Sequence, residues 1–234
     1  ISFSLRKGEN LCLVGESGCG KTTVALSILR LIDTPPSRIA DGEILYHHED
    51  LLTGSDERIR QIRGNRIAMV FQDPLSALNP VLTVGDQIVE QIRLHLGLKP
   101  KQAMEKAVTL MEQAGIPRAG DRIYDYPHQF SGGMQQRVLI AAALSCDPEI
   151  LIADEPVTAL DTIIKAQILD MFQEMKKERD MSILFITHDL GTVAGIADRM
   201  IVMYGGRLAE EGTNLDIFDR PKHPYTIGLL NCLP

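Results

Sequence analysis

Residues 15–22 of the chain, GESGCGKT, have the residue types and spacing of a loop that binds phosphate groups. Glycines let backbone N–H groups curve around phosphate oxygens without Cβ clashes, and the start of the following helix adds partial positive charge. The ammonium of Lys21 can reach β- and γ-phosphate oxygens, and the hydroxyl of Thr22 can ligate Mg²⁺. The alternative is a chance glycine-rich turn. The predicted nucleotide-binding residues of this loop are Gly15, Ser17, Gly18, Cys19, Gly20, Lys21, Thr22 and Thr23.

A second reactive cluster is the acidic pair Asp154 and Glu155, which follows the apolar run ILIA. Open α/β sheets bind ligands at the carboxyl ends of their strands, where this pair would lie. We expect Asp154 to hold Mg²⁺ through water and Glu155 to polarise or orient the water that attacks a γ-phosphate. The alternative is a capping carboxylate at a strand–helix turn.

The elements that must position these residues alternate between apolar strands and amphipathic helices. Apolar runs predict strands at residues 10–14, 43–46, 66–71, 149–153 and 182–187. Helical periodicity begins at Lys21, continues to Ile32 and is broken by the prolines after Thr34. The other predicted helices cover residues 84–96 and 101–114, the segment after Gly133, and the segment from Ile164 to Met175. Residues 200–209 predict a hairpin with a glycine turn.

This order of elements predicts the fold class. Strands that alternate with helices favour an α/β sheet. We expect one domain over residues 1–234, with a core of residues 1–72 and 145–234 and an inserted helical subdomain at about residues 73–144. The chain opens without Met and inside a strand, and we expect it to be truncated at both ends.

Composition limits the class of protein. An apolar fraction of 44% and a charged fraction of 24% are typical of a soluble globular chain. The net charge of −7 argues against binding nucleic acid through a broad basic surface. The four cysteines form no CxxC pair, which favours reduced thiols in an intracellular protein. No apolar run is long enough to predict a membrane span, and the alternating opening residues, ISFSLRKGEN, do not predict a signal peptide.

Four further motifs resemble those of the ATP-binding-cassette (ABC) ATPases. Residues 130–134, FSGGM, resemble the signature sequence, and Gln72 resembles the Q-loop glutamine. His188 resembles the switch histidine, and Ala159-Leu160-Asp161 resembles the D-loop. All motifs occur in the family's order and cover nearly the whole chain. The resemblance implies a P-loop NTPase (RecA-like) core with a mainly parallel sheet, an antiparallel β part and an inserted helical subdomain.

The resemblance also implies a role for each motif. In the family, the signature turn contacts the ATP held by the phosphate loop of a partner, so two ATP molecules lie within a head-to-tail dimer. The residues that would make this contact are Ser131, Gly132 and Gly133. Asp161 would act across the same interface. The implied catalytic residues are Glu155, His188 and Gln72, the implied ligands of Mg²⁺ are Thr22, Gln72 and Asp154, and the implied cofactors are ATP and Mg²⁺.

Two segments resemble one group of the family in particular, the oligopeptide and dipeptide importer ATPases. They are residues 71–80, FQDPLSALNP, and residues 223–226, HPYT. The resemblance implies an ATP-hydrolysing subunit that forms a homodimer, or a heterodimer with a related ATPase, at the cytoplasmic face of the cell membrane. Its implied partners are transmembrane permease subunits, which receive solute from an external solute-binding protein.

Other functions remain as alternatives. Nickel and oligosaccharide importer ATPases belong to the same group. A soluble ABC ATPase of DNA repair or translation is a more distant alternative, but the acidic balance predicts no nucleic-acid partner. A binding module without hydrolysis is a third, against which the intact Glu155 and His188 argue. The transported solute is not encoded here, because the permease and the binding protein select it.

The chain departs from the family's pattern at several positions. Met134 replaces a glutamine, and Val157 stands where threonine is usual. The aromatic residue that stacks on adenine in the family would precede Ile1. Some members carry a C-terminal iron–sulfur cluster, but Cys232 alone cannot hold one, so we interpret it as a free thiol.

Overall fold

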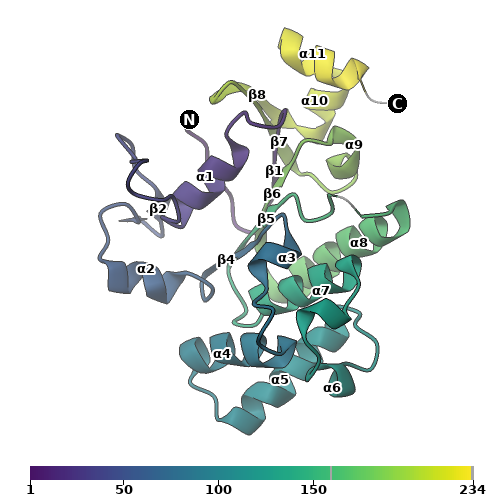
Figure 1. Cartoon of the computed structure of the whole chain (residues 1–234). Helices are drawn as coiled ribbons and strands as arrows, with labels where there is room; N and C mark the ends of the chain where they lie inside the picture. The colour runs from purple at the N-terminus through teal and green to yellow at the C-terminus, as the bar shows by residue number, and fades with distance from the viewer. Residues whose placement is uncertain (159, 233–234) are drawn as a thin grey trace. The chain divides into compact units, whose positions relative to one another are not determined.

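The computed structural model describes residues 1–158 and 160–232 (Figure 1). Ala159, the first residue of the predicted D-loop, lies outside the described residues. The chain divides into two compact units, the first formed by Ile1–Arg63 with Ser182–Pro234 and the second by Gly64–Met181.

Four strands of the first unit pair in the order β6 (Ser182–Thr187), β1 (Asn10–Val14), β7 (Arg199–Tyr204) and β8 (Arg207–Thr213). β1 pairs in parallel with both β6 and β7 and is buried along its whole length, which explains the apolar run that follows Asn10. β7 and β8 pair antiparallel across the turn Gly205-Gly206, in which both glycines have positive φ.

The other elements of the first unit are short. They are α1 (Lys21–Ile28), β2 (Leu45–Tyr46), β3 (Glu49–Asp50), α2 (Asp56–Ile62), α9 (Leu190–Val193), α10 (Asn214–Asp219) and α11 (Pro224–Asn231). α1 ends four residues before the Ile32 predicted from periodicity. Arg30 adopts the left-handed conformation (φ 51°), and the N–H of Leu31 donates to the carbonyl of Leu26 (2.8 Å), a turn that usually has glycine at this place.

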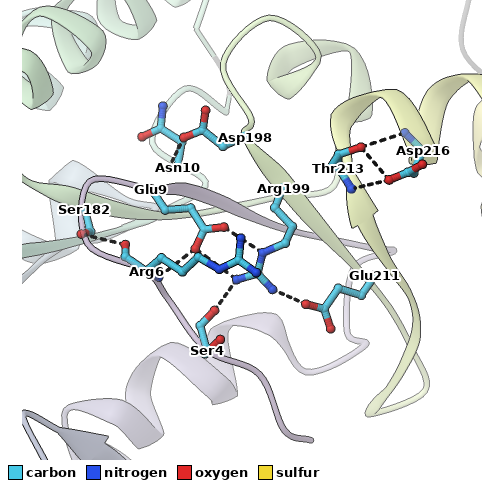
Figure 2. Close-up of polar contacts among 10 residues, drawn as sticks. All are labelled: Ser4, Arg6, Glu9, Asn10, Ser182, Asp198, Arg199, Glu211, Thr213 and Asp216. Atoms are coloured by element: carbon cyan, nitrogen blue, oxygen red, sulfur yellow. Dashed lines mark hydrogen bonds and ion pairs between the residues drawn. The ribbon is translucent and has the colours of Figure 1, made fainter.

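Buried charges tie the N-terminal segment to the hairpin of the first unit (Figure 2). Nε of Arg199 donates to Oε1 of Glu9 (2.7 Å), and both side chains are at most 10% exposed. The same guanidinium also contacts Glu211 and the carbonyl of Ser4. A buried charge is tolerated in a fold when it is paired, whereas removal of its partner strongly lowers the free energy of unfolding. This network therefore fixes the segment before β1.

The second unit combines one pair of parallel strands with helices. The strands are β4 (Ile67–Val70) and β5 (Ile150–Asp154). The helices are α3 (Pro74–Ala77), α4 (Val84–Leu96), α5 (Pro100–Gln113), α6 (Ala119–Arg122), a 3₁₀ turn (Pro127–Gln129), α7 (Gly132–Ala143) and α8 (Thr162–Arg179).

The helices of the second unit share a core in which α5 packs against α4, α6 and α7 (Figure 1). α4 is capped at its start by Thr83, whose side chain accepts from the N–H of Asp86, and at its end by Gly97 with φ 63°. α7 is buried on most of its surface, which explains the apolar run from Val138 to Ala143 in its second half. Within the described residues, no helix is both long enough and apolar enough to cross a bilayer. Parallel strand pairs, an antiparallel hairpin and a helical part confirm the predicted α/β class.

Candidate functional site

The predicted phosphate loop connects β1 to α1 in the first unit. Gly15 has φ +154°, and a Cβ placed there would lie 2.3 Å from the carbonyl oxygen of Met203, so a side chain does not fit. Gly20 (φ 104°) is the N-cap of α1 and has no side chain that could cap the first turn. The first N–H groups of α1 therefore receive no side-chain cap from Gly20 and can donate to an anion.

Lys21 places a buried positive charge on this loop. Its Nζ donates to the carbonyl oxygens of Gly15 (2.7 Å) and Glu16 (2.9 Å), and the residue is only 5% exposed. Cys19 is buried too, and its carbonyl accepts from the N–H of Gly206 (3.0 Å). The exposed residues of the loop and of the first turn of α1 are Glu16, Ser17, Gly18, Thr22 and Thr23. A buried ammonium beside an uncapped helix start fits a polyphosphate.

Strand register brings His188 to the same edge as the phosphate loop. Val14 pairs with Thr187 in the parallel ladder of β1 and β6, so Gly15 and His188 are the next residues of adjacent strands. His188 is exposed, and Asp189 after it caps α9 through a bond from the N–H of Thr192 (3.3 Å). The loop and the predicted switch histidine thus lie at the carboxyl ends of neighbouring strands.

The second unit brings together Gln72 and Glu155 by the same kind of register. Val70 pairs with Ala153 in the parallel ladder of β4 and β5, so Gln72 and Glu155 each lie two residues beyond this last pair. Nε2 of Gln72 donates to Oε2 of Glu155 (3.2 Å). Because the amide donates through its nitrogen, its oxygen is kept for another partner, such as a hard cation.

Glu155 and Asp154 are both buried, at 7% and 2% exposure. Glu155 has φ 46°, a left-handed conformation that is uncommon for a residue other than glycine and often occurs at functional sites. Oε2 of Glu155 also accepts from Oγ1 of Thr158 (2.9 Å). Sequence reasoning missed Thr158, although a hydroxyl three residues after the acidic pair, in a turn, was the available signal.

The predicted signature residues form the start of α7. Ser131 is the N-cap, and within residues 1–158 and 160–232 its side chain makes no capping bond. A Cβ on Gly133 would lie 3.1 Å from Cγ2 of Ile164, whereas a Cβ on Gly132 would meet no described atom within 4 Å. This helix start packs against α8 on one side and leaves room for a ligand beside Gly132.

Arg122 holds this turn and was not found from the sequence. Its guanidinium carbon lies 4.1 Å from the centre of the Phe130 ring, and Nη2 donates to the carbonyl of Gln129 (3.0 Å). Nη1 contacts the sulfur of Met134 (3.4 Å), so the residue that departs from the family's pattern still anchors the turn. Nε pairs with Asp125 (3.1 Å). A lone arginine outside any motif gave no sequence signal.

Asp161 has a local role that the structure shows. Oδ1 of Asp161 accepts from the N–H groups of Ile163 (3.1 Å) and Ile164 (3.0 Å), which makes it the N-cap of α8.

The predicted site residues are divided between the two units. The first unit contains the phosphate loop and His188. The second contains Gln72, the acidic pair, the signature turn and Asp161.

Comparison with known proteins supports the resemblance seen in the motifs. The family model described as ABC transporter matches residues 1–158. The chain is 52% identical over 234 residues to the dipeptide transport ATP-binding protein DppD of Bacillus subtilis (strain 168), a match that covers all of this chain and 70% of that protein. It is 49% identical over 234 residues to the oligopeptide transport ATP-binding protein OppD of the same organism, all of this chain and 65% of that protein being covered.

Solved structures give the same result for the fold. The dimeric ATP-binding cassette MJ0796, in a post-hydrolysis state bound to ADP and Pi, is similar with a TM-score of 0.80 at 26% identity, over 91% of this chain and 88% of that one. The ABC transporter component cbiO1 of Clostridium perfringens gives a TM-score of 0.79 at 26% identity, over 94% and 83%. Since the family model covers more than half of the chain and relatives match it along its whole length, the chain belongs to the ABC transporter family.

Proposed function

We propose that this chain is the ATP-binding and ATP-hydrolysing subunit that powers a membrane importer for oligopeptides or dipeptides. The peptide assignment is supported by relatives that are named as dipeptide and oligopeptide transport ATP-binding proteins and are about half identical to it. The observation that carries the hydrolytic part is the carboxylate of Glu155, which two donors hold at the end of β5. A module that only bound nucleotide would not need an oriented carboxylate there.

In the proposed reaction, the phosphate loop and Lys21 bind the β- and γ-phosphates of ATP. Glu155 accepts a hydrogen bond from the attacking water and orients it in line with the bond that joins the γ- to the β-phosphate. His188 donates to the γ-phosphate. Mg²⁺, when bound, neutralises charge on the phosphate oxygens. The oxygen donors that would hold it are those of Thr22, Gln72 and Asp154, which is the ligand class that Mg²⁺ prefers.

The proposed assembly is a head-to-tail dimer, formed by two copies or by this chain and a related ATPase. Its support is the start of α7, where Ser131, Gly132 and Gly133 present helix N–H groups, and the likeness to a dimeric cassette. We further propose permease subunits and an external solute-binding protein as partners, with the chain at the cytoplasmic face of the membrane. Residues 73–144 would form the helical subdomain within this arrangement.

The test measures solute uptake by cells whose sole copy of this subunit is either the wild type or the Lys21→Ala variant. We expect Lys21→Ala to abolish uptake of a radiolabelled dipeptide and a radiolabelled oligopeptide, and to leave uptake of nickel and of an oligosaccharide unchanged. Loss of nickel or oligosaccharide uptake with intact peptide uptake would assign the chain to that alternative. Unchanged uptake of all four solutes would reject an importer for any of them.

A further inference from the structure

The HPYT segment at residues 223–226 begins α11, and α11 contacts the phosphate loop within the first unit. The hydroxyl oxygen of Tyr225 accepts a hydrogen bond from the backbone N–H of Glu16 (3.1 Å), across 209 positions of the chain. Glu16 is the second residue of the phosphate loop. None of the roles proposed above uses this contact.

The same peptide group also binds Lys21. The carbonyl of Gly15 and the N–H of Glu16 belong to one planar peptide unit, which turns as a rigid body. Nζ of Lys21 donates to that carbonyl (2.7 Å) at one end, and Tyr225 accepts from the N–H (3.1 Å) at the other. Rotation of this peptide would therefore disturb both hydrogen bonds. It would also shift the ammonium of Lys21, which is proposed to bind the phosphates.

Tyr225 is itself held firmly enough to act on the loop. Its ring packs against the ring of Tyr204, with centroids 4.5 Å apart. Its backbone N–H donates to Nδ1 of His223, the N-cap of α11 (3.2 Å). The carboxylate of Glu210, on β8, accepts from the N–H groups of Lys222 (2.8 Å) and His223 (3.0 Å). The start of α11 is thus anchored to β8, the second strand of the hairpin.

We propose that Tyr225 is a positioning residue of the phosphate loop, through which α11 sets the affinity of the site for nucleoside di- and triphosphates. The inference rests on the proposed function, because it requires that the loop bind nucleotide. Coupling of this kind is reciprocal, so a nucleotide that orders the loop must also stabilise the contact with α11.

The first experiment removes the hydroxyl and keeps the ring. We expect Tyr225→Phe to raise the Kd for ADP and for ATP by about three- to tenfold, the usual range for one lost hydrogen bond. KM for ATP should rise by a similar factor while kcat changes less than twofold, since the loop binds ground state and transition state alike. Tyr204→Phe, which deletes a hydroxyl from the adjacent ring, is the matched control. It should leave the Kd for ADP and ATP and the KM for ATP unchanged.

The second experiment follows amide hydrogen exchange in α11. We expect ADP to slow exchange at residues 224–231 in the wild type and to have little effect there in Tyr225→Phe. A purely structural tyrosine would lower the melting temperature of the variant without changing the Kd or this ligand-dependent protection, so that result would overturn the proposal. A wild type that binds neither ADP nor ATP would overturn the proposed function as well, whereas equal affinities of wild type and Tyr225→Phe would overturn this inference alone.

Discussion

Gln72 and Glu155 are hydrogen-bonded to each other at the carboxyl ends of two parallel strands, 83 positions apart in the chain. Gln72 is the second residue of the segment at residues 71–80 that resembles the peptide importer ATPases, and Glu155 is the carboxylate proposed to orient the attacking water. A displacement of that segment would therefore change the orientation of the carboxylate directly. The bond thus links that segment directly to the carboxylate of Glu155.

Glu155→Gln keeps the shape of the side chain and removes its charge. Because a positioned acid or base contributes about 10²- to 10⁴-fold to a rate, we expect phosphate release to fall at least about 100-fold. ATP should still bind, and an ATP-dependent dimer should accumulate in size-exclusion chromatography. The matched control is Glu149→Gln, in an exposed pair with Arg66, which should turn over normally. Undiminished hydrolysis in Glu155→Gln would remove Glu155 from the reaction.

Lys21→Ala removes the buried ammonium from the phosphate loop. Hydrogen bonds to charged groups contribute about 1.5–3 kcal/mol, so we expect the Kd for ATP to rise by about 10- to 150-fold. Calorimetric titration with ATP measures this directly. Lys101→Ala, an exposed position on α5, is the control and should bind as the wild type does. Equal affinity in Lys21→Ala would contradict the assignment of the loop.

Thr158→Val deletes one of the two described donors to Oε2 of Glu155 and keeps the branched shape. We expect kcat for ATP hydrolysis to fall by about three- to tenfold, the worth of one hydrogen bond, while the Kd for ATP stays the same. Thr109→Val, on the exposed face of α5, is the comparison. A change in Kd without a change in kcat would mean that Thr158 does not position the carboxylate.

Arg122→Lys keeps the charge but loses the planar group that lies over Phe130 and bonds the turn before α7. We expect ATP-dependent dimer formation, measured by light scattering in the Glu155→Gln background, to weaken by about tenfold. Binding of ATP to the monomer should not change, because the phosphate loop is intact. Arg66→Lys is the surface control, and equal weakening by both variants would argue against a specific role of Arg122.

Acid should destabilise the chain through Glu9. Burial raises the pKa of this carboxyl, but hydrogen bonds from Arg199 and from the backbone of Arg6 outweigh it, so the pKa lies below its usual 4.5. The stabilisation is therefore complete above about pH 4.5 and is lost as the pH falls through the lower value of the folded state. Urea titrations between pH 7 and pH 3 measure this fall in the free energy of unfolding.

Arg199→Met isolates that contribution. Breaking a buried pair should cost about 3–5 kcal/mol at neutral pH and reduce the acid-dependent part of the loss. Arg58→Met, which breaks an exposed pair with Glu49, should lower the free energy of unfolding far less, because solvent screens that pair. A cost at Arg199 as small as that at Arg58 would show that the network in Figure 2 does not stabilise the fold.

The sequence predicted what depends on contiguous residues. The phosphate loop, the strand β6 and the helix α4 could be located because their signals lie within single segments. The end of α1 was missed because Arg30, and not glycine, takes the left-handed conformation. That conformation is stabilised by the turn around it, which residue type does not reveal.

Of the supporting residues of the site, Thr158 had a local signal, its hydroxyl three residues after the acidic pair, whereas the partners of Arg122 and Tyr225 are unmarked or distant in the chain. Thr158 and Arg122 act by holding neighbours, and neither belongs to a motif recognised in the sequence. Tyr225 lies in a recognised motif, but its contact with Glu16 joins residues 209 positions apart. Periodicity and spacing describe local order, whereas such contacts depend on the folded chain.

The bond from Gly206 to the carbonyl of Cys19 joins backbone to backbone (3.0 Å). The phosphate loop is thus hydrogen-bonded to the tip of the hairpin formed by β7 and β8. Because this bond joins two backbones, the position of the loop depends on the length of that hairpin more than on its side chains. A single inserted residue between Tyr204 and Arg207 would shift the tip and impair nucleotide binding, although the insertion would touch none of the family's motifs. Screens of length variants would find this dependence where screens of substitutions would overlook it.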